Sequence, residues 1–147
     1  MYNIELMGNI LIQEMKKTEK DKSIFVDTYM HQIKNKRKVI ADWVGIEFLM
    51  FDDDNTDYYD MDNWDNLYAR ITDLIQTDND SITYIIINEF SDIIKAFGKE
   101  KTYELFDYIS VNYKKHKIKY VISSQHNCFS PTMKKYANTF IKFNTKY

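Results

Sequence analysis

Asn88 and Glu89 form the clearest pair of side chains that could do chemistry in this sequence. They end and follow an unbroken apolar run, residues 82–88, which is rich in β-branched residues. Such a run predicts a strand buried on both faces, as in a parallel sheet covered by helices. Ligands of open parallel sheets lie beyond the carboxyl ends of the strands. This pair therefore predicts a ligand site, with structural polar residues as the equal alternative.

Other groups of reactive side chains suggest metal or thiol chemistry. A nuclease with one divalent ion would use Asp42, Glu89 and an Asp-rich stretch at 52–65, although that stretch lacks the glycine and closing glutamate of an EF-hand loop. His126 and the single Cys128 follow another apolar run, but no third group is present to orient a Cys-His pair. Two potential ligands also do not make a zinc site. A solvated acidic loop and a small buried cysteine are the simpler interpretations.

The elements that would position these residues alternate along the chain. Helices are expected at 23–34, 63–76, 102–114 and 131–137. Strands are expected at 9–14, 38–42, 46–51, 82–88, 118–124 and 139–143. This order predicts an α/β three-layer sandwich around a mostly parallel sheet of about five strands. The loops after Glu14, Asn88 and Ser124 are then the places for a ligand.

Three segments resemble P-loop ATPases of the zonula occludens toxin-like and virus DNA-packaging and translocase branch. The run ending in Asn88-Glu89 is similar to a Walker B strand, and residues 113–125 resemble the strand that ends in a polar sensor, here Gln125. Lys22-Ser23 stand where the family has the Lys-Ser of its phosphate loop. The resemblance implies one P-loop NTPase-like domain over residues 1–147, with the sensor strand between the P-loop and Walker B strands.

The resemblance also implies roles for these residues with ATP and Mg²⁺. Lys22 would bind the phosphates, Ser23 and Asn88 would serve the metal ion, Glu89 would activate water and Gln125 would sense the γ-phosphate. Asn88 departs from the family's aspartate, because it is isosteric but neutral.

The phosphate loop departs further from the family pattern. Lys16 and Asp21 replace its two glycines, and glycine's freedom is what lets backbone N–H groups curl around phosphates. These departures predict weak or lost hydrolysis. The alternative is a solvated lysine-rich loop in which Ser23 is the N-cap of the next helix.

Charge is distributed unevenly over the 147 residues. Residues 51–94 carry twelve acidic side chains and one basic, whereas residues 95–147 carry eleven basic and three acidic. DNA is one partner that the second stretch suggests, through Lys114, Lys115, Lys117, Lys119, Lys134 and Lys135 with interspersed tyrosines. Ordinary surface lysines are the more common interpretation of such a stretch. Another copy of the chain or a virion protein is the alternative partner.

The lone cysteine, and the absence of a leader or an apolar run of about 20 residues, predict a cytoplasmic protein, in the host cytoplasm if viral. The functional expectation is a degenerate ATPase of a virus or mobile element, acting in DNA packaging, translocation or virion assembly. A non-catalytic scaffold that keeps the ATPase fold is the first alternative, and the metal-dependent nuclease is the second.

Overall fold

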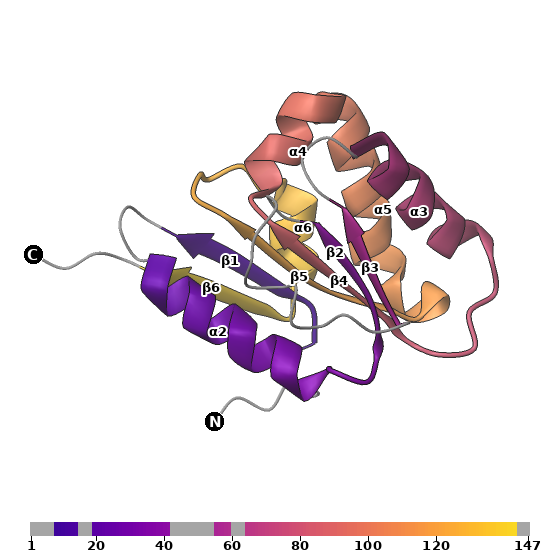
Figure 1. Ribbon diagram of the computed structural model, residues 1–147. Coiled ribbons are helices and arrows are strands. Elements are labelled where there is room, and N and C mark those ends of the chain that lie inside the picture. The colour runs from indigo at the N-terminus through magenta and orange to yellow at the C-terminus, as the bar shows by residue number, and fades with distance from the viewer. Residues whose placement is uncertain (1–7, 15–18, 42–54, 60–63, 144–147) are drawn as a thin grey trace, which may run out of the picture.

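The computed structural model describes residues 8–14, 19–41, 55–59 and 64–143, except for the side chains of 19–24 and 27. These residues form one sheet flanked by helices on both faces (Figure 1). The three-layer α/β sandwich predicted from the sequence is therefore confirmed. Within the described ranges, no helix is both long enough and apolar enough to cross a bilayer.

In the described residues the sheet has six strands, and all of its strand pairs are parallel. The strands lie in the spatial order β3-β2-β4-β5-β1-β6. Their bounds are β1 Ile10–Glu14, β2 Arg37–Ala41, β3 Thr56–Tyr59, β4 Thr83–Asn88, β5 Ile118–Ser124 and β6 Thr139–Phe143. The strand β5 lies between β1 and β4, as the resemblance implied.

Helices cover the two faces of the sheet unequally. Helix α2 packs on one face, where Phe25, Tyr29 and Met30 meet Ile12 and Ile86 of the sheet. The other four helices pack on the opposite face (Figure 1). Helix bounds are α2 Glu19–Gln32, α3 Trp64–Gln76, α4 Phe90–Phe97, α5 Lys99–His116 and α6 Pro131–Tyr136. Because β4 is buried from both sides, its unbroken apolar run needs no polar alternation.

Three expectations from the sequence need correction. Residues 56–59 form the edge strand β3 rather than part of an Asp-rich loop, and their polar pattern, exposed at the centre, gave no strand signal. Residues 90–97 form the amphipathic helix α4, which was not expected. Helix α2 begins at Glu19, four residues before the predicted start at Ser23. The strand predicted at 46–51 lies outside the described residues.

The amino ends of the central and edge strands are fastened by the buried Asn9. Its side-chain Oδ1 accepts a hydrogen bond from the Tyr120 backbone N–H at 3.0 Å, and its own backbone N–H donates to Asn138 Oδ1 at 2.9 Å. Gly8 precedes it at φ 64°, and a Cβ there would lie 2.4 Å from Asn138 Oδ1. These contacts hold β1, β5 and β6 in register where they begin.

Stability is expected to fall as the pH drops below 6.5, because His116 is buried in its neutral form. Burial, followed by the charge of Lys115, lowers the pKa of His116 below its usual 6.5, and Tyr108 Oη lies 2.8 Å from Nε2. A lowered folded pKa means that the stabilisation is present above pH 6.5 and is lost as the pH falls through the folded value. Urea unfolding at pH 7.5 and pH 5 measures the difference.

The variant His116→Gln should lose part of this pH dependence. The matched variant His126→Gln, at an exposed histidine, should keep it. Equal pH dependence in the wild type and His116→Gln would contradict the assignment.

Candidate functional site

The carboxyl ends of β4 and β5 bring polar side chains together at one edge of the sheet. Asn88 and Ser123 are register partners on these adjacent strands, and Ser123 Oγ donates a hydrogen bond to Asn88 Oδ1 at 2.9 Å. Ser124 is paired with Gln13 of β1 on the other side. Three parallel strands therefore end in polar residues, as expected for the ligand-binding edge of an open α/β sheet.

Glu89 links the ends of β4 and β5 through its carboxylate. Its Oε1 accepts a hydrogen bond from the Gln125 backbone N–H at 2.8 Å, and its Oε2 accepts one from Ser91 Oγ at 2.9 Å. The half-buried Glu89 adopts a left-handed backbone conformation at φ 69° and ψ 74°. A left-handed backbone is costly for a residue with a side chain, and it persists only when its surroundings impose it. The two hydrogen bonds identify part of that constraint.

The loop after β5 places Gln125 and Cys128 near Glu89 in different ways. Gln125 is exposed and contributes its backbone N–H to the Glu89 carboxylate. The half-buried Cys128 has its Sγ 3.1 Å from Ser124 Oγ. Burial raises the pKa of the Cys128 thiol, while the Ser124 contact lowers it by a smaller amount. A raised pKa disfavours the thiolate, so this cysteine does not have the environment of an activated nucleophile.

Lys22 and Ser23 lie inside helix α2 rather than at its first position. The helix begins at Glu19, which makes Lys22 its fourth residue and Ser23 its fifth. Free backbone N–H groups belong to the first turn of a helix, here residues 19–21. The alternative in which Ser23 caps the helix is therefore wrong, and the side chains of both residues lie outside the described part of the molecule.

Sequence reasoning identified Asn88, Glu89 and Gln125, and the structure brings all three to one edge. It did not identify Ser91 and Ser123, which hold the Glu89 and Asn88 side chains. The sequence signal for Ser123 was its place at the end of the 118–124 run, beside the end of the neighbouring strand. Ser91 follows Glu89 by two residues, a spacing that carries no signal until the chain turns there.

The described residues do not assemble a metal cluster. No group of three or more His, Cys, Asp or Glu side chains lies together within those ranges. Asp57 of the acidic stretch instead pairs with Arg70 at 3.2 Å, and Asp42 of the nuclease interpretation lies outside the described residues. This geometry gives the nuclease interpretation no support.

The topology defines the class of fold: an all-parallel sheet with the polar-ended strand β5 between β1 and β4 is the P-loop ATPase arrangement. Solved structures agree. The cytoplasmic domain of EssC superposes on 92% of this chain with a TM-score of 0.68 at 14% identity, over 32% of its own length.

Two further structures show the same fold. The cytoplasmic domain of the type VII secretion ATPase EccC from Thermomonospora curvata matches 87% of this chain and 19% of its own, with a TM-score of 0.62 and 16% identity. The conjugation coupling protein TcpA of pCW3, solved in monomer form with ATPγS, matches 88% of this chain and 47% of its own, with a TM-score of 0.58 and 12% identity.

These comparisons establish the fold of P-loop ATPase domains for this chain. The chain spans less than half the length of each of these structures. No protein-family model matches the sequence. No curated protein matches it either.

The described residues fit one end of a nucleotide site better than the other. Asn88 Oδ1 and Ser123 Oγ lie 2.9 Å apart, and the Glu89 carboxylate follows β4 at the same edge of the sheet. Oxygen atoms of these kinds suit the water shell of Mg²⁺. A phosphate cradle requires backbone N–H groups converging at a helix N-terminus, and here Lys22-Ser23 come one turn later. At this edge the described residues therefore offer oxygen atoms for a metal ion, whereas Lys22 and Ser23 lie beyond the first turn of α2.

Proposed function

We propose that this chain is a degenerate P-loop ATPase-like protein of a virus or mobile element, acting in DNA packaging, translocation or virion assembly. The observation that carries the proposal is the joint placement of Asn88, Glu89 and Gln125 at the carboxyl edge, on the strands β4 and β5 that the ATPase fold uses. The neighbouring EccC and TcpA, titled a secretion ATPase and a conjugation coupling protein, support a role in moving macromolecules.

Each residue at the edge has a distinct proposed role. Lys22 binds the phosphates, Ser23 and Asn88 serve Mg²⁺, Glu89 orients water and Gln125 contacts the terminal phosphate. When bound, the nucleotide and its Mg²⁺ supply a phosphoryl group activated for transfer to water. The chain supplies the orientation and the charge around it.

Hydrolysis is proposed to be weak because Glu89 is already engaged. Both of its carboxylate oxygens accept hydrogen bonds from the protein, one from Gln125 and one from Ser91. A carboxylate accepts about four hydrogen bonds, so a water oriented by Glu89 would share an oxygen with the Gln125 or Ser91 donor. These two protein donors compete with that water for the carboxylate charge. The same observation favours the second candidate function, a scaffold in which Glu89 fastens β4 to β5.

Thermal melting with and without a non-hydrolysable ATP analogue and Mg²⁺ tests the proposal. Binding to the folded state raises the free energy of unfolding by about 2.7 kcal/mol when ligand reaches 100 times Kd, and the melting midpoint rises with it. The wild type should show a rise at millimolar ligand, and Lys22→Ala should lose it. The matched variant Lys34→Ala, at an exposed lysine after the end of α2, should keep the rise. No rise in the wild type would leave the scaffold as the function.

Glu89→Gln separates turnover from binding in the same protein. Glutamine keeps an oxygen and the side-chain length, so it should preserve the fold and the nucleotide-dependent rise in melting while abolishing phosphate release. If Glu89→Gln released phosphate at the wild-type rate, the role proposed for Glu89 would be wrong.

A further inference from the structure

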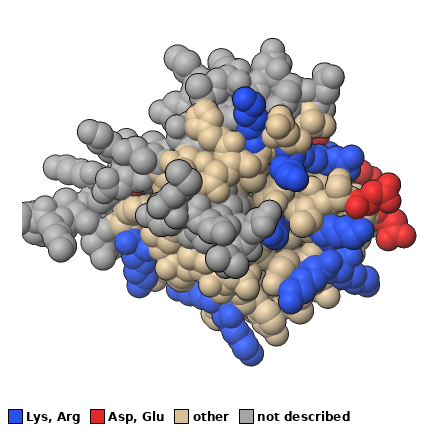
Figure 2. Space-filling view, turned by 90° about the horizontal axis from the view of Figure 1, so that it is seen from below, with Lys and Arg blue, Asp and Glu red and all other residues tan. Residues whose placement is uncertain are grey.

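The amino ends of the strands gather lysine and arginine side chains from distant parts of the sequence. In a parallel sheet, every segment that precedes a strand lies at the same edge. Lys36 and Arg37 lead into β2, Lys117 leads into β5, and Lys135 lies in the helix before β6. Figure 2 shows Lys and Arg side chains gathered on the right of the view from below, beside a small acidic group. We call the edge of the sheet at which the strands begin the amino edge.

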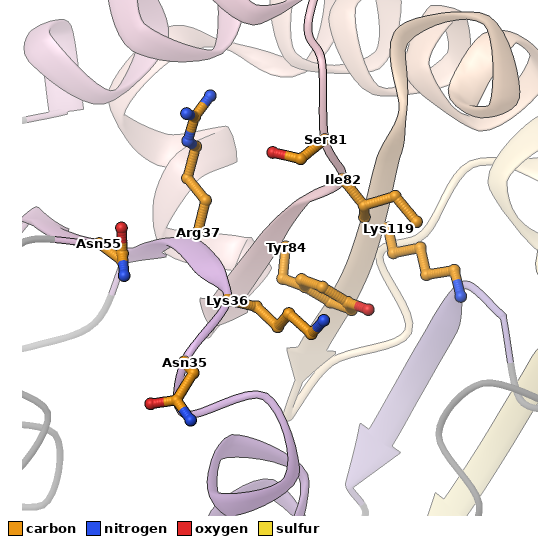
Figure 3. A pocket seen from close by; sticks show the side chains of 8 residues that line it. All are labelled: Asn35, Lys36, Arg37, Asn55, Ser81, Ile82, Tyr84 and Lys119. Carbon is orange, nitrogen blue, oxygen red and sulfur yellow. The ribbon is translucent and has the colours of Figure 1, made fainter.

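A polar groove lies at the amino edge between β2, β4 and β5. It has a volume of about 510 Å³, and three cationic side chains line it, those of Lys36, Arg37 and Lys119. Asn35, Asn55 and Ser81 add polar groups to its wall (Figure 3). The volume lies within the range of small-ligand sites, roughly 300–1,000 Å³.

Among the described residues that line the groove, three are cationic and none carries a carboxylate. Among the described residues, none of the ion pairs involves Lys36, Arg37 or Lys119. Acidic residues flank two of the lining residues along the chain: Asp54 precedes Asn55 and Asp80 precedes Ser81. Asp57, two residues after Asn55, pairs with Arg70. Lysine and arginine are the side chains that recognise phosphate, and amide and hydroxyl groups add hydrogen bonds to its oxygens.

The walls of the groove are held in place by backbone and buried contacts. The ammonium of Lys38, a fully buried residue, donates to the carbonyls of Lys34 at 2.8 Å and Lys36 at 2.9 Å. This fixes the turn that carries Asn35 and Lys36. The Lys38 backbone N–H donates to Asn55 O at 2.8 Å, and the Thr83 N–H to Lys117 O at 2.9 Å. A fixed wall loses less entropy when a ligand binds.

We propose that this groove is a second, separate site that binds the phosphate groups of a phosphorylated ligand. The carboxyl edge, at which nucleotide binding is proposed above, is at the opposite end of β4, whose six residues span about 17 Å. One bound nucleotide at the carboxyl edge therefore does not account for the groove. The phosphate belongs either to a free phosphorylated molecule or to the backbone of a nucleic-acid strand, and these sources differ in how far along the edge they reach.

A nucleic-acid strand bound along the amino edge would also cover a second groove, which lies on this edge beside the start of β6. Lys114, Lys115 and Lys135 line this groove of about 570 Å³, together with Tyr113 and Tyr136. Tyr136 is exposed and Tyr113 is half-buried, and accessible aromatic rings beside lysines are a stacking surface for bases. Four strand spacings of about 4.8 Å separate β2 from β6, so the edge is roughly 19 Å long and accommodates several successive phosphates of a strand.

The test uses two probes without Mg²⁺: inorganic tripolyphosphate, and a fluorescent oligodeoxythymidylate of roughly 15 nucleotides. The variant Lys36→Gln/Arg37→Gln/Lys119→Gln should weaken both probes at least about tenfold, since one hydrogen bond to a charged group is worth about that factor. With three phosphate contacts, the affinity of the oligonucleotide for this groove should fall with a log–log salt slope of about −2. The matched variant Lys95→Gln/Lys99→Gln/Lys101→Gln removes equal charge from α4 and the start of α5 and should bind as the wild type does.

The second groove distinguishes the two sources. If Lys114→Gln/Lys115→Gln/Lys135→Gln weakens the oligonucleotide but not tripolyphosphate, the ligand is a strand; if it weakens neither, the ligand is a small phosphorylated molecule. Lys22→Ala should leave both probes bound, which keeps this site distinct from the nucleotide edge. The proposal would be overturned if neither probe showed saturable binding. It would also be overturned if Lys36→Gln/Arg37→Gln/Lys119→Gln kept the wild-type melting midpoint and bound both probes as tightly as the wild type.

Discussion

Replacing Phe90 with alanine should lower the free energy of unfolding by about 3–5 kcal/mol, the range for removing a large aromatic side chain from a packed core. Phe90 is fully buried, and its ring lies 5.1 Å from that of Phe106 and 5.7 Å from that of Phe129. It is also the first residue of α4, directly after Glu89. One ring therefore joins α4, α5 and the loop after β5.

Urea unfolding followed by circular dichroism measures this change. Tyr136→Ala is the matched control, because this aromatic side chain is 41% exposed and its loss should cost less than about 1 kcal/mol. Phe90→Ala should also reduce the melting response to nucleotide, since α4 sets the position of Glu89. A loss of stability below about 1.5 kcal/mol would mean that α5 and the loop after β5 close the cavity by repacking.

The fold was predictable because its strongest signals were buried strands. The runs at 10–14, 83–88 and 118–124 are apolar throughout much of their length, since helices cover both faces of a parallel sheet. Helix α3 likewise showed its apolar stripe, of which Trp64, Leu67, Ile71 and Leu74 are buried. Edge strand β3 was missed because its residues are only partly buried or exposed, so its sequence has no apolar run that would predict a strand.

The candidate site was predictable in part. Strand ends at one edge of a parallel sheet predicted the meeting of Asn88, Glu89 and Gln125, but not which atoms bond to which. The left-handed conformation of Glu89 is imposed by tertiary contacts, so no local pattern announces it. Helix α2 begins earlier than predicted because Glu19, Lys20 and Asp21 are compatible with a helix and no proline interrupts them.

The distribution of charge along the chain concealed the charge of the folded surface. The basic groove at the amino edge joins Lys36 and Arg37, from a nearly neutral part of the sequence, with Lys119 from the basic part. Counting charges along the chain pointed to the C-terminal stretch alone. The parallel topology accounts for Lys36 and Arg37, because the segments that precede parallel strands all lie at one edge of the sheet.

Lys38→Met should lower the free energy of unfolding by about 2–3 kcal/mol. A lysine at the start of a strand is ordinarily exposed, yet Lys38 is fully buried, and its ammonium also lies 3.4 Å from the carbonyl oxygen of Ile33. Methionine matches its length but donates no hydrogen bond. Loss of charge-assisted bonds to the Lys34 and Lys36 carbonyls costs roughly 1.5–3 kcal/mol each, partly offset by water and by no longer burying a charge.

The same change tests how the amino edge is organised, because Lys38 does not line the groove. If its ammonium fixes the turn that carries Lys36, Lys38→Met should weaken tripolyphosphate binding about tenfold. The matched variant Lys34→Met removes the same charge from an exposed position on that turn and should change stability by less than about 0.5 kcal/mol. Unchanged stability and binding in Lys38→Met would mean that water satisfies these carbonyls and that the groove is shaped by β2 and β4 alone.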